Sequence, residues 1–527
     1  MERLERAVGD GARVVDLDED RESTLADITQ QIIECQKAAN NTLESSRKLL
    51  AKLHIYDSMA SIKLGGSAKL GKTSTPEDFI VSLCEILRPN QAIVDEIDLE
   101  QDPFKGLLPT PNLDVFKSSA SIALGAIRDS LTEELMASNG EIRNKVVIAI
   151  ATHSDPLADW FDEENAKVCD SVRETYAPHV ESKDVLVEYI LKSIVKPVFG
   201  KGPRTITEQG RKAMRVPQAR PEVFSFSDEK PWRKDKPEAL SLLLFAIANL
   251  KHESVEQNWH LIVPPILTTL DEGDVLSKSH ACGILERVIA SVGSDFLNRT
   301  GLGSVFEEAI SPCLHFLPPI TPVNHSIKSF RAAVATSVAL SKHRYSGPDE
   351  GMWYKALDKI LRGGPFYGMT YAGENVSMVE LFLQETKTLV KLLGVRSVRH
   401  LSKLVPLCTA QLVSPFIMTH PRLGHQAAET LIEVIRNCWP KIPEYNAEIL
   451  KGVVFCWMRI KDEEKADSAV NLLKNELKVV MVVLEHVNRG STTWFEEAKT
   501  AIMDREAGLE GLFGLISSTE AGSPMAR

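Results

Sequence analysis

Two stretches of apolar residues between positions 259 and 292 repeat at helical spacing. Apolar residues recur three and four positions apart from Trp259 to Leu270, and again from Ala281 to Val292. This spacing places them on one side of a helix. The polar residues 271–274 between the stretches indicate a short turn that folds the second helix back on the first. Such a pair buries its apolar faces only by stacking on further pairs, as in an α-solenoid.

The same spacing continues along most of the chain and predicts an all-α, HEAT-like solenoid of stacked antiparallel helix pairs. Before residue 200 we expect helices near 25–53, from Pro76 onward, and near 112–137, 140–152, 164–176 and 182–197. Later helices are expected near 238–250, 258–271, 277–292, 302–317, 324–342, 352–362, 376–393, 396–413, 422–438, 444–459 and 463–487. Repeats of two helices in ~40–47 residues are of the HEAT type.

Breaks in this pattern divide the chain into five expected regions. Residues 1–22 are charged and poor in apolar residues, so we expect a disordered N-terminus before an N-terminal helical region at 23–198. Residues 199–237 contain five prolines and a basic cluster, and we interpret them as a linker or long loop. We expect the C-terminal HEAT-like solenoid at 238–490, and a final helix with a disordered tail at 491–527.

Two short segments need a separate interpretation. Residues 146–151 form a continuous apolar run that suits either a buried strand or a helix, and the helical neighbours favour a helix. Residues 363–373 combine glycines with Phe366, Tyr367 and Tyr371, and we expect a surface loop there.

Composition and charge restrict the class of partner. The net charge of −11 over 527 residues argues against nucleic acid or an anionic membrane, because both select a basic surface. We find no secretory signal and no apolar run approaching the ~20 residues that cross a bilayer. The eight cysteines are scattered without a Cys-x-x-Cys pair, which is typical of reduced, buried thiols. A cytoplasmic and nuclear location is therefore expected.

One motif suggests that the chain binds a nucleotide. Residues Gly66 to Thr73 match the phosphate-loop pattern, which requires a buried strand before it and a helix that starts at Lys72. The preceding residues are polar and helical in character, and the best helix start comes later, at Pro76. We interpret the motif as a flexible loop and keep a nucleotide-binding enzyme as the least favoured alternative. The histidines and carboxylate pairs form no metal or acid–base set, so no catalytic residue, metal or cofactor is predicted.

Three groups of residues resemble, in order, the sequence blocks of the Tel-two-interacting protein two family. The first block is Val263-Pro264-Pro265-Ile266-Leu267 with Asp271, Lys278 and Gly283, preceded by Pro231-Trp232. The second block is Arg299-Thr300-Gly301-Leu302 with Phe306, followed by Leu317-Pro318-Pro319-Ile320. The third block is His420-Pro421-Arg422-Leu423, Cys438-Trp439-Pro440-Lys441-Ile442 and Cys456-Trp457. The resemblance covers about residues 231–460.

This resemblance implies a non-enzymatic scaffold or adaptor subunit of the Triple-T complex, bound to two larger solenoid subunits. That complex works with the ninety-kilodalton heat-shock chaperone to mature and stabilise phosphatidylinositol-3-kinase-related kinases of the TOR, ATM and ATR classes. The implied processes are growth signalling, the DNA-damage response and telomere maintenance, and in fungi also the chromatin-associated ASTRA assembly. An importin-like transport solenoid is the main alternative.

Two residue-level expectations follow from the blocks. An Asp at the turn (Asp271 or Asp274) and the basic Lys278 that opens the second helix are expected to pair with neighbouring repeats, as charged residues at HEAT turns often do. Trp439 follows an apolar stripe that includes Ile435, so its indole is predicted to cover the end of that helix. The alternative is that Trp439 caps a partner-binding groove, because Trp is enriched among interface hot spots.

Overall fold

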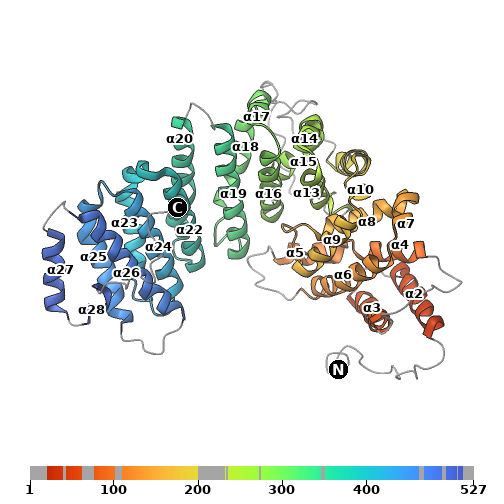
Figure 1. Cartoon of the computed structure of the whole chain (residues 1–527), viewed down its shortest axis with the longest axis horizontal. Helices are drawn as coiled ribbons and strands as arrows, with labels where there is room; N and C mark the ends of the chain where they lie inside the picture. The colour runs from red at the N-terminus through yellow and green to blue at the C-terminus, as the bar shows by residue number, and fades with distance from the viewer. Residues whose placement is uncertain are drawn as a thin grey trace. The chain divides into compact units, whose positions relative to one another are not determined.

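The chain forms helices in both of its compact units. The structure is a computed structural model and describes residues 21–38, 43–61, 76–100, 110–199, 232, 235–271, 274–345, 350–461, 468–489, 494–506 and 508–513. Every regular element in these ranges is a helix, which confirms the predicted all-α class (Figure 1). The chain divides into unit 1, Met1–Ala309, and unit 2, Ile310–Arg527. None of the helices in the described ranges is long and apolar enough to span a membrane.

The helices of unit 1 begin with α2 (Arg21–Ala38), α3 (Leu43–Ser61), α4 (Pro76–Ile86), α5 (Gln91–Glu100), α6 (Pro111–Ser130), α7 (Glu133–Ser138), α8 (Gly140–His153), α9 (Glu163–Thr175) and α10 (Ala177–Val180). They continue with the π-helix η1 (Asp184–Val195), α11 (Lys196–Val198), α13 (Ala239–Asn249), α14 (His252–Gln257), α15 (Trp259–Asp271), α16 (Val275–Ala290), α17 (Ser294–Thr300) and α18 (Gly303–Ile310). Consecutive helices pack as pairs, as α2 does on α3 and α15 on α16.

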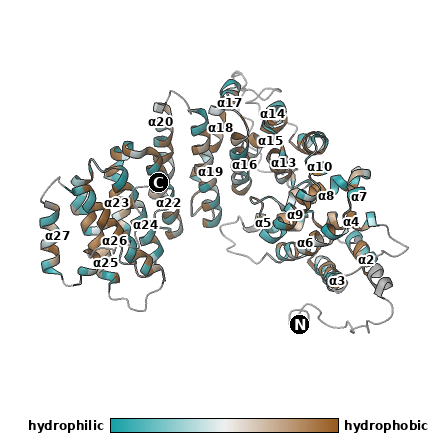
Figure 2. Ribbon diagram, viewed as in Figure 1, coloured by the Kyte–Doolittle hydropathy of each residue, from teal (hydrophilic) through white to brown (hydrophobic). Residues whose placement is uncertain are grey.

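The helices of unit 2 are the 3₁₀ helix η2 (Ser311–His315), α19 (Val323–Arg344), α20 (Glu350–Leu361), the π-helix η3 (Arg362–Phe366), α21 (Tyr367–Ala372), α22 (Val376–Leu393), the 3₁₀ helix η4 (Gly394–His400), α23 (Leu401–Val413), α24 (Pro421–Asn437), the 3₁₀ helix η5 (Ile442–Tyr445), α25 (Asn446–Ile460), α26 (Ser468–Asn488), α27 (Trp494–Arg505) and α28 (Glu510–Phe513). One row of helices runs from α22 through α24 to α26, and α23 packs on α25 in a second row. Hydrophobic residues lie where the helices of each unit face one another (Figure 2).

Hydrogen bonds between neighbouring pairs show the length of the repeat. In unit 2, Lys387 bonds to Glu429 at 2.9 Å and Asn446 bonds to Asn488 at 2.6 Å, each across 42 residues. The Thr430 hydroxyl also donates to the Leu383 carbonyl, 47 residues earlier. In unit 1, the Tyr176 hydroxyl donates to the Leu131 carbonyl across 45 residues. These separations match the predicted HEAT-type period and confirm the HEAT-like stacking within each unit.

Short polar residues start several helices locally. Helix α4 begins at Pro76, as predicted. The Asp274 carboxylate accepts the Ser277 N–H at 2.8 Å at the start of α16, and Asn375 accepts the Met378 N–H at 3.1 Å at the start of α22. These side chains satisfy N–H groups that have no partner inside their own helix. The turns of the array are therefore specified by the residues at the helix ends.

Residues 363–372 are helical and Gly373 lies in the turn that follows them, so the predicted surface loop is wrong. They form most of η3 and all of α21, and Gly364, Pro365 and Phe366 are buried. A Cβ on Gly368 would lie 2.4 Å from Cζ of the fully buried Phe382, so only glycine permits this close approach. Packing of the segment against Phe382 of α22 thus overrides the turn-like composition. Residues 146–151, in contrast, lie in α8 as expected and are all buried.

The segment 199–237 does not separate two units. Helix α13 follows it and packs on η1 and α8, which precede it. The buried rings of Phe199 and Trp232 lie 5.5 Å apart. We expected a discontinuity near 200–237, but the division falls between Ala309 and Ile310, because the apolar helices η1 and α13 bury each other. The predicted disordered N-terminus and tail, and most of the linker, lie outside the described residues.

Candidate functional site

The first sequence block packs the α15–α16 pair. Pro265 is buried inside α15, and Pro264 beside it is half-buried. The Trp259 ring of α15 meets Phe306 edge-on at 6.4 Å, and Phe306 is fully buried. Edge-to-face aromatic pairs of this kind add to the stabilisation that burial itself provides. Trp259 and Phe306 therefore hold α18 against α15.

Two charged residues of the α15–α16 turn make contacts within this helix pair. The buried Lys278 donates from its Nζ to the Leu270 carbonyl near the end of α15. Asp274 caps α16, and Asp271 is the exposed last residue of α15. We expected these groups to join neighbouring repeats, whereas these contacts join the two helices of the same pair.

Gly283 and a buried contact between Asp155 and His280 connect α16 with the segment after α8. A Cβ on Gly283 would lie 2.5 Å from Cδ1 of Leu157, so the glycine allows this segment to approach. Asp155 is buried, and its Oδ2 lies 2.8 Å from Nε2 of His280. Burial acts to raise the pKa of Asp155, but the His280 imidazole beside it, together with the hydrogen bond from the Leu157 N–H, holds that pKa below its usual value. The pair gives no signal in the sequence because the two residues lie far apart in the chain.

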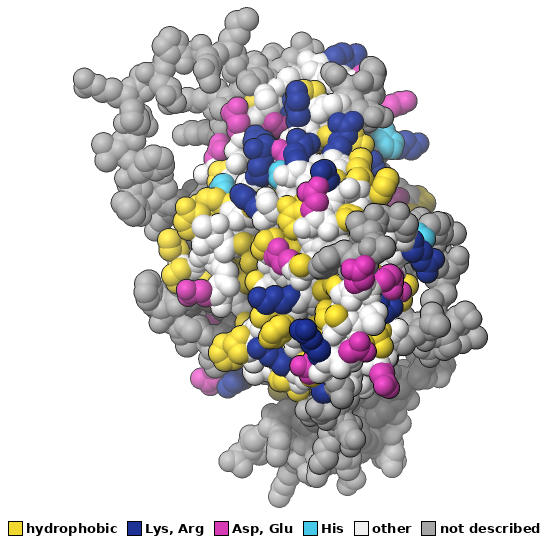
Figure 3. All heavy atoms as spheres, turned by 90° about the vertical axis from the view of Figure 1, so that its left-hand side faces the viewer, with side chains coloured by type: hydrophobic (Ala, Val, Ile, Leu, Met, Phe, Trp, Pro, Cys, Tyr) yellow, Lys and Arg dark blue, Asp and Glu magenta, His cyan; other side chains and the backbone are white. Residues whose placement is uncertain are grey.

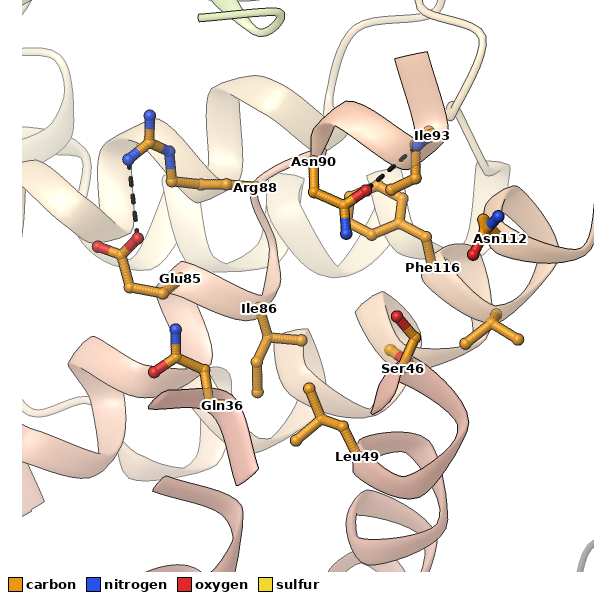
Figure 4. Close-up of a pocket in the computed structure, with 12 residues that line it drawn as sticks. Gln36, Ser46, Leu49, Glu85, Ile86, Arg88, Asn90, Ile93, Asn112 and Phe116 are labelled. Atoms are coloured by element: carbon orange, nitrogen blue, oxygen red, sulfur yellow. Dashed lines mark hydrogen bonds and ion pairs between the residues drawn. The ribbon is translucent and has the colours of Figure 1, made fainter. Parts of the chain in front are cut away.

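Two cavities of unit 1 are lined by polar groups that already bind one another. In a cavity of about 150 Å³, Arg88 faces Glu85 and Asn90 caps α5 through the Ile93 N–H (Figure 4). Arg88 also donates to the buried Glu238 at 2.7 Å. A cavity of about 290 Å³ beside Asp155 contains Arg173, which pairs with Asp170 at 3.1 Å. Of these contacts, Arg88–Glu238 joins the segment after α4 to the start of α13, and the others are local to one helix or its end.

The second block lies at helix ends. Gly301 ends α17 with a φ of 69°, in the left-handed region that favours glycine. Arg299 is exposed in the last turn of the same helix. Pro318 is half-buried and joined to Pro319 by a cis peptide bond, and Ile320 after it is exposed.

The third block contains two tryptophans in opposite environments. Trp457 of α25 is 5% exposed, and its Nε1–H donates to the Gly508 carbonyl at 3.0 Å. Trp439 follows α24 and is 59% exposed, beside the exposed Pro440. The Trp439 ring therefore lies outside the core, contrary to the packing interpretation.

In the first block, Trp232 is buried, and Pro231 lies outside the described residues.

The opposite end of α24 has a cavity of about 240 Å³. It is lined by Phe416 and His420 at the α23–α24 turn and by Leu423 of α24. Phe416 is 67% exposed, and the exposed Arg422 lies near Glu380 of α22. The sequence blocks included His420 and Arg422 but not Phe416, because an aromatic residue in a turn gives no periodic signal.

The described residues contain no group of three or more His, Cys, Asp or Glu side chains placed to hold a metal ion. Seven of the eight cysteines are buried, and burial raises the pKa of the Cys84 and Cys408 thiols. The phosphate-loop match at 66–73 lies outside the described residues.

The fold and its blocks define a helical-repeat protein of the HEAT-like class. The Tti2 family model matches residues 146–419, from α8 to the turn after α23. Because this match covers more than half of the chain, the chain belongs to the Tti2 family.

The chain is also similar to characterised proteins. It is 23% identical over 249 residues to TEL2-interacting protein 2 of Saccharomyces cerevisiae, which covers 44% of this chain and 58% of the yeast protein. The chain thus spans less than two thirds of that relative. Among solved structures, karyopherin Kap121p bound to the extreme C-terminus of the phosphatase Cdc14p matches 92% of this chain and 46% of its own, with 12% identity and a TM-score of 0.44. Kap121p bound to Pho4p matches 93% and 43%, with 13% identity and a TM-score of 0.41.

Proposed function

We propose that this chain is a non-enzymatic scaffold subunit of a Triple-T complex, bound to two larger solenoid subunits. In this role it acts with the ninety-kilodalton heat-shock chaperone in the maturation and stability of phosphatidylinositol-3-kinase-related kinases of the TOR, ATM and ATR classes. Its effects then extend to growth signalling, the DNA-damage response and telomere maintenance. We propose a cytoplasmic and nuclear location, with no direct contact to nucleic acid or membrane.

The match of the Tti2 family model to residues 146–419 supports this proposal most strongly. The matched residues form stacked helix pairs, and the residues of the first block pack those pairs together. Stacked repeats of this kind present long surfaces to other proteins. The name of the yeast relative, TEL2-interacting protein 2, also agrees with a role in binding Tel2.

Exposed apolar side chains of unit 2 supply surfaces for such binding. Figure 3 views the molecule from the side on which α25, α26 and α27 lie, where hydrophobic side chains are interspersed with charged ones. In these helices the exposed large hydrophobic residues are Phe455, Leu472, Val482 and Met503. Interfaces between separately folded proteins commonly combine apolar and charged groups in this way.

Affinity purification of the tagged full chain from its native cells tests the proposal. We expect the two larger Triple-T subunits and at least one phosphatidylinositol-3-kinase-related kinase to co-purify. Depletion of the chain should lower the steady-state level of those kinases without lowering their messenger RNA. Recovery of nucleoporins and a small GTPase, without any Triple-T subunit, would instead identify an importin-like transport protein.

A further inference from the structure

The end of α22 and the end of α24 meet at one edge of unit 2. The chain leaves α22 through η4 and leaves α24 toward η5. The Ser397 hydroxyl of η4 lies 3.1 Å from the Cys438 thiol, and α24 packs on η4. Val395 and Trp439 lie within two residues of this contact. We call the surface formed by Leu392, Val395, Arg396, Trp439, Pro440 and Lys441 the η4–η5 edge.

The η4–η5 edge exposes apolar side chains on an anchored backbone. Trp439 is 59% exposed, Val395 55% and Leu392 37%. The neighbouring Ser397 and Cys438 are both fully buried. The exposed side chains are therefore held by a packed backbone, so little conformational entropy is lost when a partner covers them.

The charges around the η4–η5 edge are mainly positive. Lys391, Arg396, Arg399, Arg436 and Lys441 are exposed cations at or beside it. Arg436 pairs with Glu433, Lys441 pairs with Glu444 at 2.5 Å, and Arg399 pairs with the buried Asp358 at 3.7 Å. Lys391 and Arg396 have no ion pair with a carboxylate of the described residues, and the Arg396 guanidinium stacks over the Tyr354 ring at 3.9 Å. A chain with a net charge of −11 thus has a locally basic, apolar surface here.

We infer that the η4–η5 edge binds an acidic segment of a partner protein. In this arrangement an apolar side chain of the segment packs on Trp439 and Val395, and its carboxylates face Lys391 and Arg396. Tryptophan and arginine are the residues most enriched among interface hot spots, and charge complementarity directs the encounter. The inference rests on the proposed function, since it assigns the segment to one of the two larger Triple-T subunits.

Binding of the purified full-length chain to the two purified larger subunits of the same organism tests the inference. Trp439→Ala should weaken binding at least about 30-fold, as loss of a hot spot does. The double variant Lys391→Glu/Arg396→Glu should weaken binding at least about tenfold, and added salt should weaken wild-type binding. Phe416→Ala is the aromatic control, because Phe416 is at least as exposed as Trp439 but lies beyond the other end of α23. Lys342→Glu, at an exposed cation of α19, is the charge control, and both controls should stay within about threefold of wild type.

Each other outcome has a separate meaning. If the wild type binds but Trp439→Ala and the double variant bind equally well, the inference is wrong while the proposed function stands. If the wild type binds neither larger subunit, both fail. If a single-stranded oligonucleotide competes for binding, the η4–η5 edge binds nucleic acid and not an acidic protein segment. If the chain self-associates and Trp439→Ala abolishes this, the edge binds a second copy of the chain. If Trp439→Ala lowers the melting temperature, its loss of binding could reflect unfolding, and the binding of Lys391→Glu/Arg396→Glu then decides whether the inference holds.

Discussion

Trp439 and Trp457 belong to one sequence block but to two different regions of unit 2. Trp457 lies in the interior between α25 and the segment at Gly508, and the Lys478 side chain of α26 lies 5.8 Å over its ring. Trp439 lies on the η4–η5 edge with most of its ring exposed. The two tryptophans therefore contribute differently: Trp457 stabilises the fold, and Trp439 is available to a partner. Residue type and block membership do not distinguish these roles.

The difference arises from where each helix ends. Trp457 falls on the apolar stripe of α25 with Val453 and Ile460, so the helical period directs its ring inward. The stripe of α24 continues from Ile435 to Cys438, which is fully buried. Helix α24 ends at Asn437, so helical periodicity no longer fixes the direction of Trp439.

The largest predicted effect is at the buried tryptophan. Trp457→Ala should lower the free energy of unfolding by about 3–5 kcal/mol, because it removes a large buried ring and leaves a cavity. Urea denaturation followed by circular dichroism measures this change. Trp457→Phe, which keeps most of the packing and loses the hydrogen bond to Gly508, should cost about half as much or less. A Trp457→Ala variant as stable as wild type would remove the contrast with Trp439.

A buried histidine extends the comparison to unit 1. His153 is 1% exposed, and its Nε2 lies 3.0 Å from the Leu87 carbonyl. Burial lowers the pKa of His153 to about 4. The folded state therefore resists protonation of His153, and the free energy of unfolding decreases as the pH falls from about 6.5 through about 4. The decrease is up to about 1.4 kcal/mol per pH unit and on the order of 3 kcal/mol in total.

Urea denaturation at several pH values between 4 and 7 measures this loss. His153→Gln should flatten the dependence on pH, because it removes the group that takes up the proton. His260→Gln, at an exposed position of α15, should keep the wild-type slope. Equal slopes for wild type and His153→Gln would show that other groups govern the loss.

Gly368 and Gly283 differ, as the two tryptophans do, in whether their surroundings are buried or partly exposed. Gly368→Ala should destabilise unit 2 by about 1–3 kcal/mol, because the new methyl group meets the buried ring of Phe382. Gly283→Ala meets only the end of the partly exposed Leu157 side chain, which can move, so we expect less than about 1 kcal/mol. Thermal denaturation compares the variants, and Gly283→Ala with Leu157→Ala should relieve the clash. A larger cost at Gly283 than at Gly368 would reverse the comparison.

The smallest effect on stability is expected at the η4–η5 edge. Trp439→Ala should change the free energy of unfolding by no more than about 0.5 kcal/mol, because the ring is mostly in solvent already. The same urea titration used for Trp457→Ala measures it. If Trp439→Ala lowers the free energy of unfolding by 2 kcal/mol or more, the Trp439 ring packs in the fold and the partner-binding assignment is wrong.

Much of the helical pattern could be predicted from the sequence, because apolar stripes directly determine which helix faces are buried. The stripes of α15 and α22 gave their bounds within one residue. Residues 363–373 were mispredicted because glycine composition indicates a turn, whereas the burial that makes them helical depends on Phe382 in the next helix. The Asp155–His280 pair and the exposure of Trp439 depend on tertiary packing, which periodicity does not describe.

Hydroxyl-radical footprinting with mass spectrometry tests the central contrast most directly. The oxidation rates of Trp439 and Trp457 are compared in the purified chain and in the complex with the two larger subunits. We predict that Trp439 reacts readily in the isolated chain and is protected several-fold in the complex, while Trp457 reacts slowly in both. A Trp439 that is as reactive in the complex as alone would contradict its assignment to a partner-binding surface.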